Sequence, residues 1–138
     1  MATPATIASQ PVYGLGHPKT PGGGLVLLEQ HTAAGSATLD FTTCISATYD
    51  EYLIEIVNVV PATNSVAFYM RMGTGGGPTF DGGANYGWVS FSFRAGAMAT
   101  TGLNSGATQI QLAYNATISN SADWGVTGSL RLCSPGSA

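Results

Sequence analysis

Short runs in which apolar residues alternate with polar or small ones are the feature of this sequence that most constrains its fold. Residues 66–72 (VAFYMRM), 89–94 (VSFSFR) and 110–114 (IQLAY) all show this pattern. A period of two places alternate side chains on opposite faces of a strand, so each run has one face to bury. Glycine, proline, asparagine and serine separate the runs about every ten residues. The pattern predicts an all-β, antiparallel, jelly-roll-like β-sandwich.

The predicted strands follow these runs along the chain. They cover residues 25–31, 36–44, 49–60, 66–72, 86–94, 108–115 and 125–133. Residues 52–60 (YLIEIVNVV) are apolar on both faces, which is typical of a central strand, and Pro61 is expected to end it because proline cannot donate to a ladder. Two connecting segments, the glycine-rich 73–85 and residues 95–106, are predicted to be flexible, and a loop as long as the first is usually functional or mobile.

Composition and charge exclude several classes of protein. With 138 residues, the chain has the length of one domain. Only 8% of residues are charged while 44% are hydrophobic, a balance that argues against disorder. The net charge of -3 offers no basic surface for nucleic acid. No apolar run approaches the roughly 18 residues of a membrane-spanning helix, and no leader peptide is recognisable, so we expect a soluble protein made in a cytoplasm.

The first 24 residues differ in character from the rest of the chain. Prolines at 4, 11, 18 and 21 precede three consecutive glycines, and few residues could anchor a core. Residues 1–24 are therefore predicted to be an extended N-terminal arm, and residues 25–138 the β-sandwich domain. An ordinary disordered terminus is the alternative. In a docking arm, the spaced apolar anchors would be Ile7, Val12, Tyr13 and Leu15.

Several strings of residues resemble a β-rich domain that recurs in structural proteins of tailed-bacteriophage and prophage virions. They are LDFT at 39–42, YDEYLIEIVNVVP at 49–61, Arg71, TFDG at 79–82 and Asn85-Tyr86. The resemblance covers about residues 25–134. It implies a jelly-roll-like sandwich in a tail fibre, spike or head-surface component, often trimeric, with an N-terminal segment that docks onto the particle. Such proteins usually continue beyond the equivalent of residues 130–135 with further strands, whereas this sequence stops at Ala138, so we expect either a naturally short copy or a truncated version.

The resemblance and the strand pattern together define the expected role and partners. We expect a non-enzymatic virion structural protein, synthesised in the host cytoplasm and anchored to other virion proteins through residues 1–24. A shortened sandwich would leave strand edges open, and another subunit would cover them most simply, so a homo-oligomer is expected, with a trimer as the first guess by analogy. Nucleic acid and membrane insertion are not expected.

The titratable residues do not assemble a recognisable catalytic site. The histidines are His17, in the expected arm, and His31, at the end of a predicted strand. Adjacent Asp50 and Glu51 would point to opposite faces of a strand, so they cannot form the carboxylate pair of a glycoside hydrolase. Glu51 and Glu55 could share a face, but cross-strand pairing with Arg71 or Arg94 is the simpler interpretation. A small glycan-degrading enzyme, which would need a close acid pair in a cleft, is the remaining alternative.

No metal or cofactor site is predicted. Cys44 and Cys133 are far apart in sequence and form no ligand motif, so two buried thiols are expected, with a disulfide as the alternative if their strands adjoin. Residues 81–85 (DGGAN) lack the acid density of a calcium loop and are interpreted as a turn. Residues 73–77 have no following lysine or helix, so they do not form a phosphate cradle.

Aromatic residues near predicted loop ends are the better indication of binding. Tyr86 and Trp88 follow the glycine-rich segment, and Trp124 precedes the last predicted strand. Such rings can stack on sugars, although they often pack as the end of a core. A second hypothesis is therefore a host-receptor module that contacts surface polysaccharide through Tyr86, Trp88 or Trp124 and the segments 73–85 and 95–106.

Overall fold

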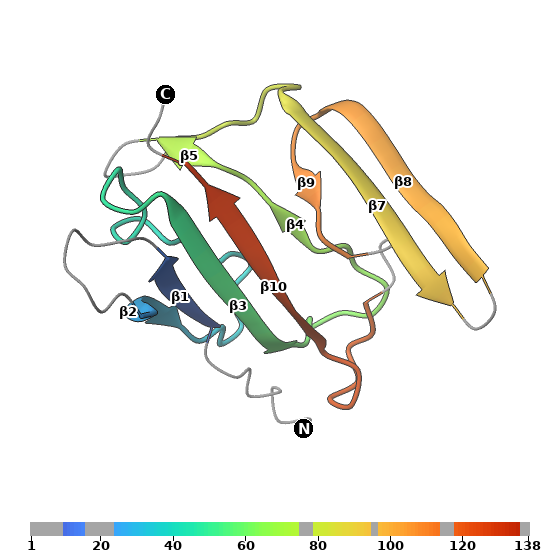
Figure 1. Ribbon diagram of the computed structural model, residues 1–138. Coiled ribbons are helices and arrows are strands. Elements are labelled where there is room, and N and C mark those ends of the chain that lie inside the picture. Colours follow the sequence, from blue (N-terminus) through green and yellow to red (C-terminus); the bar gives the residue numbers. More distant parts are fainter. Residues whose placement is uncertain (1–9, 16–23, 75–78, 95–96, 114–117, 136–138) are drawn as a thin grey trace.

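The structure is a computed structural model that describes residues 10–15, 24–74, 79–94, 97–113 and 118–135. This part of the chain is all-β: it contains no helix, and every strand pairing in it is antiparallel (Figure 1). A membrane-spanning helix is accordingly not found among the described residues. The all-β, antiparallel class predicted from the alternating runs is confirmed.

The largest element is a four-stranded sheet. Its strand order is β10 (Val126–Cys133), β3 (Glu51–Val59), β1 (Gln10–Leu15) and β2 (Val26–His31). The central position predicted for the 52–60 run is confirmed, because β3 is hydrogen-bonded to β10 on one side and to β1 on the other. The strand ends at Val59, two residues before Pro61.

Alternate residues of β3 form the interior of this sheet. Tyr52 is fully buried and Ile56 is 8% exposed. Ile54 lies opposite Val12 of β1 and Leu130 of β10, so residues from three strands share one face. An apolar stripe that crosses three paired strands removes these side chains from water, which is the main favourable contribution to folding.

Three two-stranded pairings complete the described structure. They are β4 (Tyr69–Met70) with β9 (Ile110–Gln111), β5 (Gly73–Thr74) with β6 (Thr79–Phe80), and β7 (Tyr86–Arg94) with β8 (Ala97–Ala107). In Figure 1 the β7–β8 ribbon lies on the opposite side of the molecule from β2, and β4 and β9 lie between that ribbon and β10. The ribbon pairs with no other described strand.

Several sequence-based predictions of local structure are wrong. Among the described residues, the strands predicted at 66–72 and 108–115 are reduced to β4 and β9, and the segment 73–85, predicted to be flexible, contains β5 and β6. Residues 36–44 form no strand; Phe41 and Thr43 of this segment pack on β2 through a ring contact to His31 and a hydrogen bond to Glu29, rather than through a backbone ladder. Residues 95–106, predicted to be flexible, lie mostly within β8. That strand is rich in Ala, Thr and Gly, so it has no apolar alternation, and its pairing with β7 comes from the backbone.

The N-terminal region also differs from the expected arm. Gln10–Leu15 is strand β1, an interior strand of the four-stranded sheet, and Val12 has no exposed surface. A fully buried side chain cannot contact a neighbouring virion protein. Tyr13 and Leu15 lie on the same strand, whereas Ile7 is outside the described residues. The boundary of the β-domain therefore lies at or before Gln10 rather than at residue 25.

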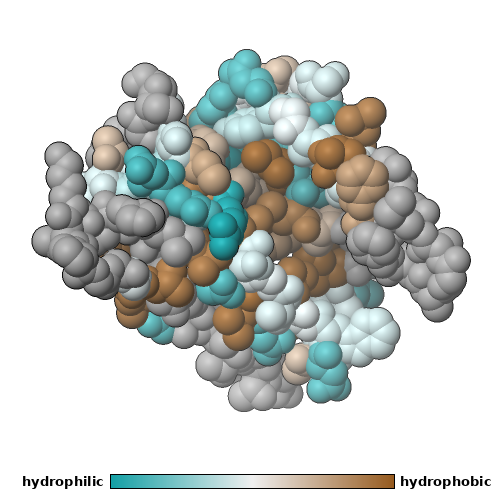
Figure 2. Space-filling view, viewed as in Figure 1, coloured by the Kyte–Doolittle hydropathy of each residue, from teal (hydrophilic) through white to brown (hydrophobic). Residues whose placement is uncertain are grey.

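Apolar side chains also reach the surface. Figure 2 shows hydrophobic residues spread across one side of the molecule rather than confined to its interior. The large hydrophobic residues that are most exposed are Leu25, Val26, Leu27, Val57, Tyr69, Val89, Phe91, Leu103 and Trp124. The sequence predicts that a strand with one apolar face buries that face. The apolar face of β7 is instead left uncovered by the described residues of the same chain.

Candidate functional site

A shallow pocket lies beside Trp88 on strand β7. It has a volume of about 360 Å³ and lies where the β4–β9 pair meets the β7–β8 ribbon. Its polar and aromatic lining comes from both pairs and the segment that connects β8 to β9: Tyr69, Trp88, Asn104, Thr108, Gln109 and Gln111. The volume lies within the range of about 300–1,000 Å³ that is typical of small-molecule sites.

Strand register places the lining residues together. Tyr69 of β4 lies directly opposite Gln111 of β9, and Trp88 of β7 lies directly opposite Asn104 of β8. Each cross-strand pair therefore combines one aromatic ring with one side-chain amide. Gly102 makes room for the indole of Trp88, because a Cβ atom there would lie 2.5 Å from Cζ3 of that ring.

The side-chain amides of Asn104 and Gln111 are each held in place by one hydrogen bond, which uses one of the two polar atoms of the amide. Asn104 accepts a bond of 2.9 Å from the backbone N–H of Gly106 through Oδ1. Gln111 donates a bond of 2.8 Å to the backbone carbonyl of Ala113 through Nε2. The Nδ2 group of Asn104 and the Oε1 atom of Gln111 remain as a donor and an acceptor for other partners.

The indole N–H of Trp88 is a buried donor with no partner. Its Nε1 atom has almost no exposed surface and makes no hydrogen bond within the described structure. Leaving such a donor unpaired costs about 1–3 kcal/mol. In a folded protein, an unpaired group of this kind commonly marks the place of a water or a ligand.

The other two aromatic candidates are not in this pocket. Tyr86 is only 8% exposed, and its hydroxyl bonds to the backbone of Met72 and to the carbonyl of Asp81. It is therefore a structural residue that ties the start of β7 to the preceding loop, and it does not line the pocket. Trp124 is 72% exposed in the turn before β10 and does not line the pocket.

A second polar cluster surrounds Glu29 on strand β2. His31 bonds to the Glu29 carboxylate through Nε2 at 2.5 Å, and Thr43 donates to the other oxygen at 3.2 Å. Burial by itself raises the pKa of Glu29, but hydrogen bonds from His31, Cys44 and Thr43 outweigh burial and hold that pKa below its ordinary value of 4.5. The cluster fastens the 41–44 segment to β2.

The same cluster makes Cys44 a poor nucleophile. Burial raises the pKa of the Cys44 thiol, and a hydrogen bond to the Glu29 carboxylate and its negative charge raise it further, to about 12. A thiol with this pKa carries almost no thiolate at neutral pH, and the thiolate is the reactive form. Chemistry at Cys44 is therefore disfavoured.

Alkylation should distinguish the two cysteines. Both thiols are free; Cys133 is exposed and Cys44 is half-buried, so the predicted burial of both thiols is wrong for Cys133. At pH 8, we expect iodoacetamide to modify Cys133 at least about 100-fold faster than Cys44, because so little Cys44 is ionised. Mass spectrometry of peptides over time measures both rates. Cys133→Ser should abolish the fast phase, and equal rates would contradict the protected environment of Cys44.

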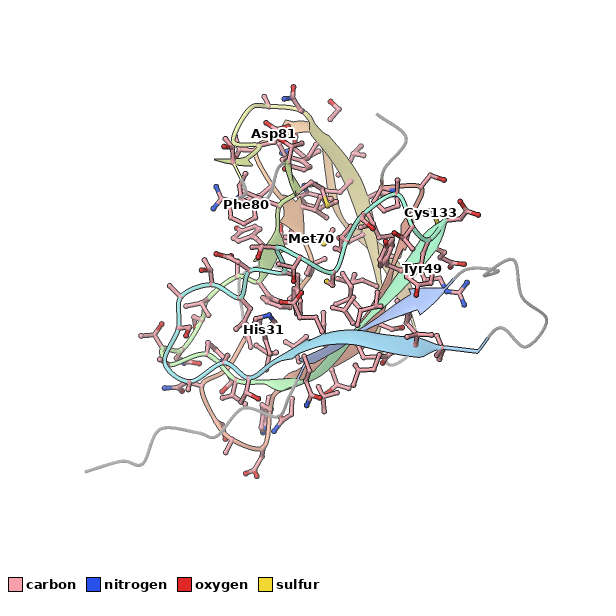
Figure 3. The ribbon with its side chains drawn as sticks, turned by 90° about the vertical axis from the view of Figure 1, so that its left-hand side faces the viewer. His31, Tyr49, Met70, Phe80, Asp81 and Cys133 are labelled. Carbon is pink, nitrogen blue, oxygen red and sulfur yellow. The ribbon has the colours of Figure 1, made fainter. Side chains whose placement is uncertain are left out.

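The acidic residues do not converge on one site. Glu51 pairs with Arg131 across β3 and β10 at 2.8 Å, whereas Arg71 lies over the ring of Phe80; the predicted pairing of Glu51 with Arg71 or Arg94 is thus replaced by Arg131. Figure 3 shows His31 and Asp81 in separate parts of the molecule. Within the described ranges, no three His, Cys, Asp or Glu side chains are placed to hold a metal.

The turn predicted at residues 81–85 has a defined geometry. Asp81 accepts a hydrogen bond of 2.8 Å from the Gly83 backbone, and both of its oxygens accept from Asn85. The bonds from Asn85 and Gly83 lower the pKa of Asp81. Both oxygens of the Asp81 carboxylate thus accept hydrogen bonds within the turn. These bonds account for the position of the Asp81 side chain without a bound cation.

Comparisons with known proteins add no relative. A scan against protein-family models found no match, and searches of curated proteins and of solved structures found none either.

Proposed function

We propose that the protein is a non-enzymatic structural component of a bacteriophage virion, displayed on the particle as an oligomer. In this proposal the strands form a jelly-roll-like sandwich in a tail fibre, spike or capsid decoration. Two considerations support it: the resemblance of residues 25–134 to phage structural domains, and the uncovered apolar strand faces of the chain.

The outer face of the β7–β8 ribbon is the observation that carries the proposal. This face is defined here by Val89, Phe91 and Leu103, which are 53%, 56% and 76% exposed. Val89 lies directly opposite Leu103, and Phe91 follows two residues later on the same side of β7. The three side chains thus form one apolar patch with no charged member. Such patches on soluble proteins usually mark interaction surfaces.

The ribbon itself also favours a partner. A two-stranded antiparallel ribbon is at best marginally stable in water unless a further strand or layer covers it. In the described structure, Trp88 on the inner face of the ribbon and Gln111 of β9 line the same pocket, while the outer face and the β8 edge have no strand against them. A neighbouring subunit that covers the outer face would supply the missing layer.

The four-stranded sheet offers a second apolar surface. Leu25, just before β2, and Leu27, within it, are both 53% exposed, and Val57 of β3 is 38% exposed. The edges of this sheet are β2 and β10, and in the described structure neither has an outer neighbour. Open strand edges and exposed apolar residues promote association between chains, so a second copy is the partner we propose, with a trimer as the first expectation.

Anchoring to the particle is assigned to the chain before β1. Because Gln10–Leu15 belongs to the sheet, the docking segment of the proposal is residues 1–9, including Ile7. Deletion of residues 1–24 would remove an interior strand and so could not separate docking from folding. Deletion of residues 1–9 leaves every described strand in place.

The location of the protein on phage particles tests this proposal. Antibodies against the chain, applied to purified particles of the phage that encodes it, should label the particle surface in electron micrographs. The variant that lacks residues 1–9 should fold and oligomerise but be missing from particles. Particles that contain no detectable chain would contradict the virion role, and normal incorporation of the variant would contradict docking through residues 1–9.

A further inference from the structure

The pocket beside Trp88 has a lining that selects for one kind of ligand. None of the described residues that line it is charged. Phosphates and carboxylates are usually recognised by arginine, lysine or clustered backbone donors, so an anionic ligand has no counter-charge here. The presence of three side-chain amides and two hydroxyls indicates a neutral ligand with many hydrogen-bonding groups.

The aromatic residues provide the apolar part of the surface. Tyr69 is 43% exposed at the pocket and Trp88 forms its wall on β7. Flat rings bury large apolar areas and prefer flat partners. The C–H face of a sugar ring is such a partner, and its edge carries the hydroxyl groups that amides bind.

The amides are suited to paired hydroxyl groups. Asn104 and Gln111 are each fixed through one polar atom, so their remaining donor and acceptor are ordered before a ligand arrives. Gln109 is half-buried in the same lining and makes no hydrogen bond to another described side chain. Preorganised groups bind more tightly because less side-chain entropy is lost on binding.

The buried N–H of Trp88 provides an independent observation. It is the only buried side-chain polar atom without a partner among the described residues, and it belongs to a residue of the pocket wall. A ligand hydroxyl that reached this donor after a small shift of the indole would remove the cost of leaving it unpaired.

We propose that this pocket binds a neutral hexopyranose, either as a free sugar or as one residue of a polysaccharide. Tyr69 and Trp88 contact the C–H face of the ring, and Asn104, Gln109 and Gln111 bind its hydroxyl groups. Tyr86 and Trp124 take no part. The proposal does not depend on the virion role, because it concerns a site within one chain.

Tryptophan fluorescence provides the test. The chain has two tryptophans, so Trp124→Phe leaves Trp88 as the only one. Titration of this variant with D-glucose, D-galactose and N-acetyl-D-glucosamine is expected to change the Trp88 emission saturably for at least one sugar, with a Kd on the order of 1 mM. Calorimetry on the unmodified protein should give the same Kd, since Trp124 lies outside the pocket.

Site variants and other ligand classes make the test decisive. In the Trp124→Phe background, Tyr69→Ala should weaken binding about tenfold by removing an exposed stacking surface. Gln109→Ala, which breaks no described side-chain hydrogen bond, should weaken it about threefold, with an unchanged circular dichroism spectrum. The proposal is overturned if no neutral sugar binds, if neither variant alters binding, or if adenosine or N-acetylneuraminic acid binds more tightly than every neutral sugar.

Discussion

Tyr52→Ala should lower the free energy of unfolding by about 3–5 kcal/mol, the range expected when a large aromatic side chain is removed from a core. Tyr52 has no exposed surface, and its hydroxyl donates to the Ser46 carbonyl at 2.8 Å and accepts from the Ser46 amide at 3.0 Å. It therefore joins β3 to the segment before it. Because domains are stable by only about 5–15 kcal/mol, much of this variant should be unfolded.

Tyr52→Phe is the matched control, since it removes only the hydroxyl. We expect it to lower the free energy of unfolding by about 1 kcal/mol, because Ser46 is exposed and water can replace the lost partner. Urea denaturation followed by circular dichroism measures both variants. Equal losses in the two would contradict the placement of Tyr52 in the core.

Phe91→Lys combined with Leu103→Lys should dissociate the oligomer and leave the subunit folded. Both side chains are more than half exposed within one chain, so charge there costs the isolated subunit little. In an oligomer, two lysines buried in an apolar contact would be unpaired, and that cost is large. We expect association to weaken at least about 100-fold, because an aromatic residue that anchors an interface contributes roughly 2 kcal/mol or more.

Thr63→Lys combined with Asn64→Lys provides a control that adds the same charge elsewhere on the chain. Both residues are exposed in the loop after β3 and belong neither to the outer face nor to the pocket beside Trp88. Sedimentation velocity should show the first double variant as a monomer and the control as an oligomer. Dissociation of both would attribute the effect to net charge rather than to the outer face.

Long strands could be predicted from their runs of apolar residues, whereas the alternating runs at 66–72 and 110–114 form, among the described residues, only the two-residue strands β4 and β9. The long runs that became β3, β7 and β10 were predicted within a few residues. The missed strand β1 contains Pro11, which is tolerated because it lies near the strand end, opposite Gln30 of β2 and before the pairing with β3 begins at Val12. In the sequence, that proline is one of several that suggest a free arm.

The residues of the pocket could also be predicted only in part from the sequence. Trp88 could be selected from the sequence because an aromatic residue near a loop is a common binding residue. Tyr69 and Gln111 could not be joined to it, because they come from two short strands that meet β7 only in the folded chain. Tyr86 has the same sequence signal as Trp88, but its hydroxyl is used by the backbone of Met72 and Asp81.

The native mass of the purified full-length protein tests the central claim most directly. The claim is that apolar strand faces left open in one chain are covered by further copies of the same chain. Sedimentation equilibrium at micromolar concentration should give a mass of about three times 14.1 kDa, and in any case a multiple of it. A single 14.1 kDa species across the concentration range would contradict the account.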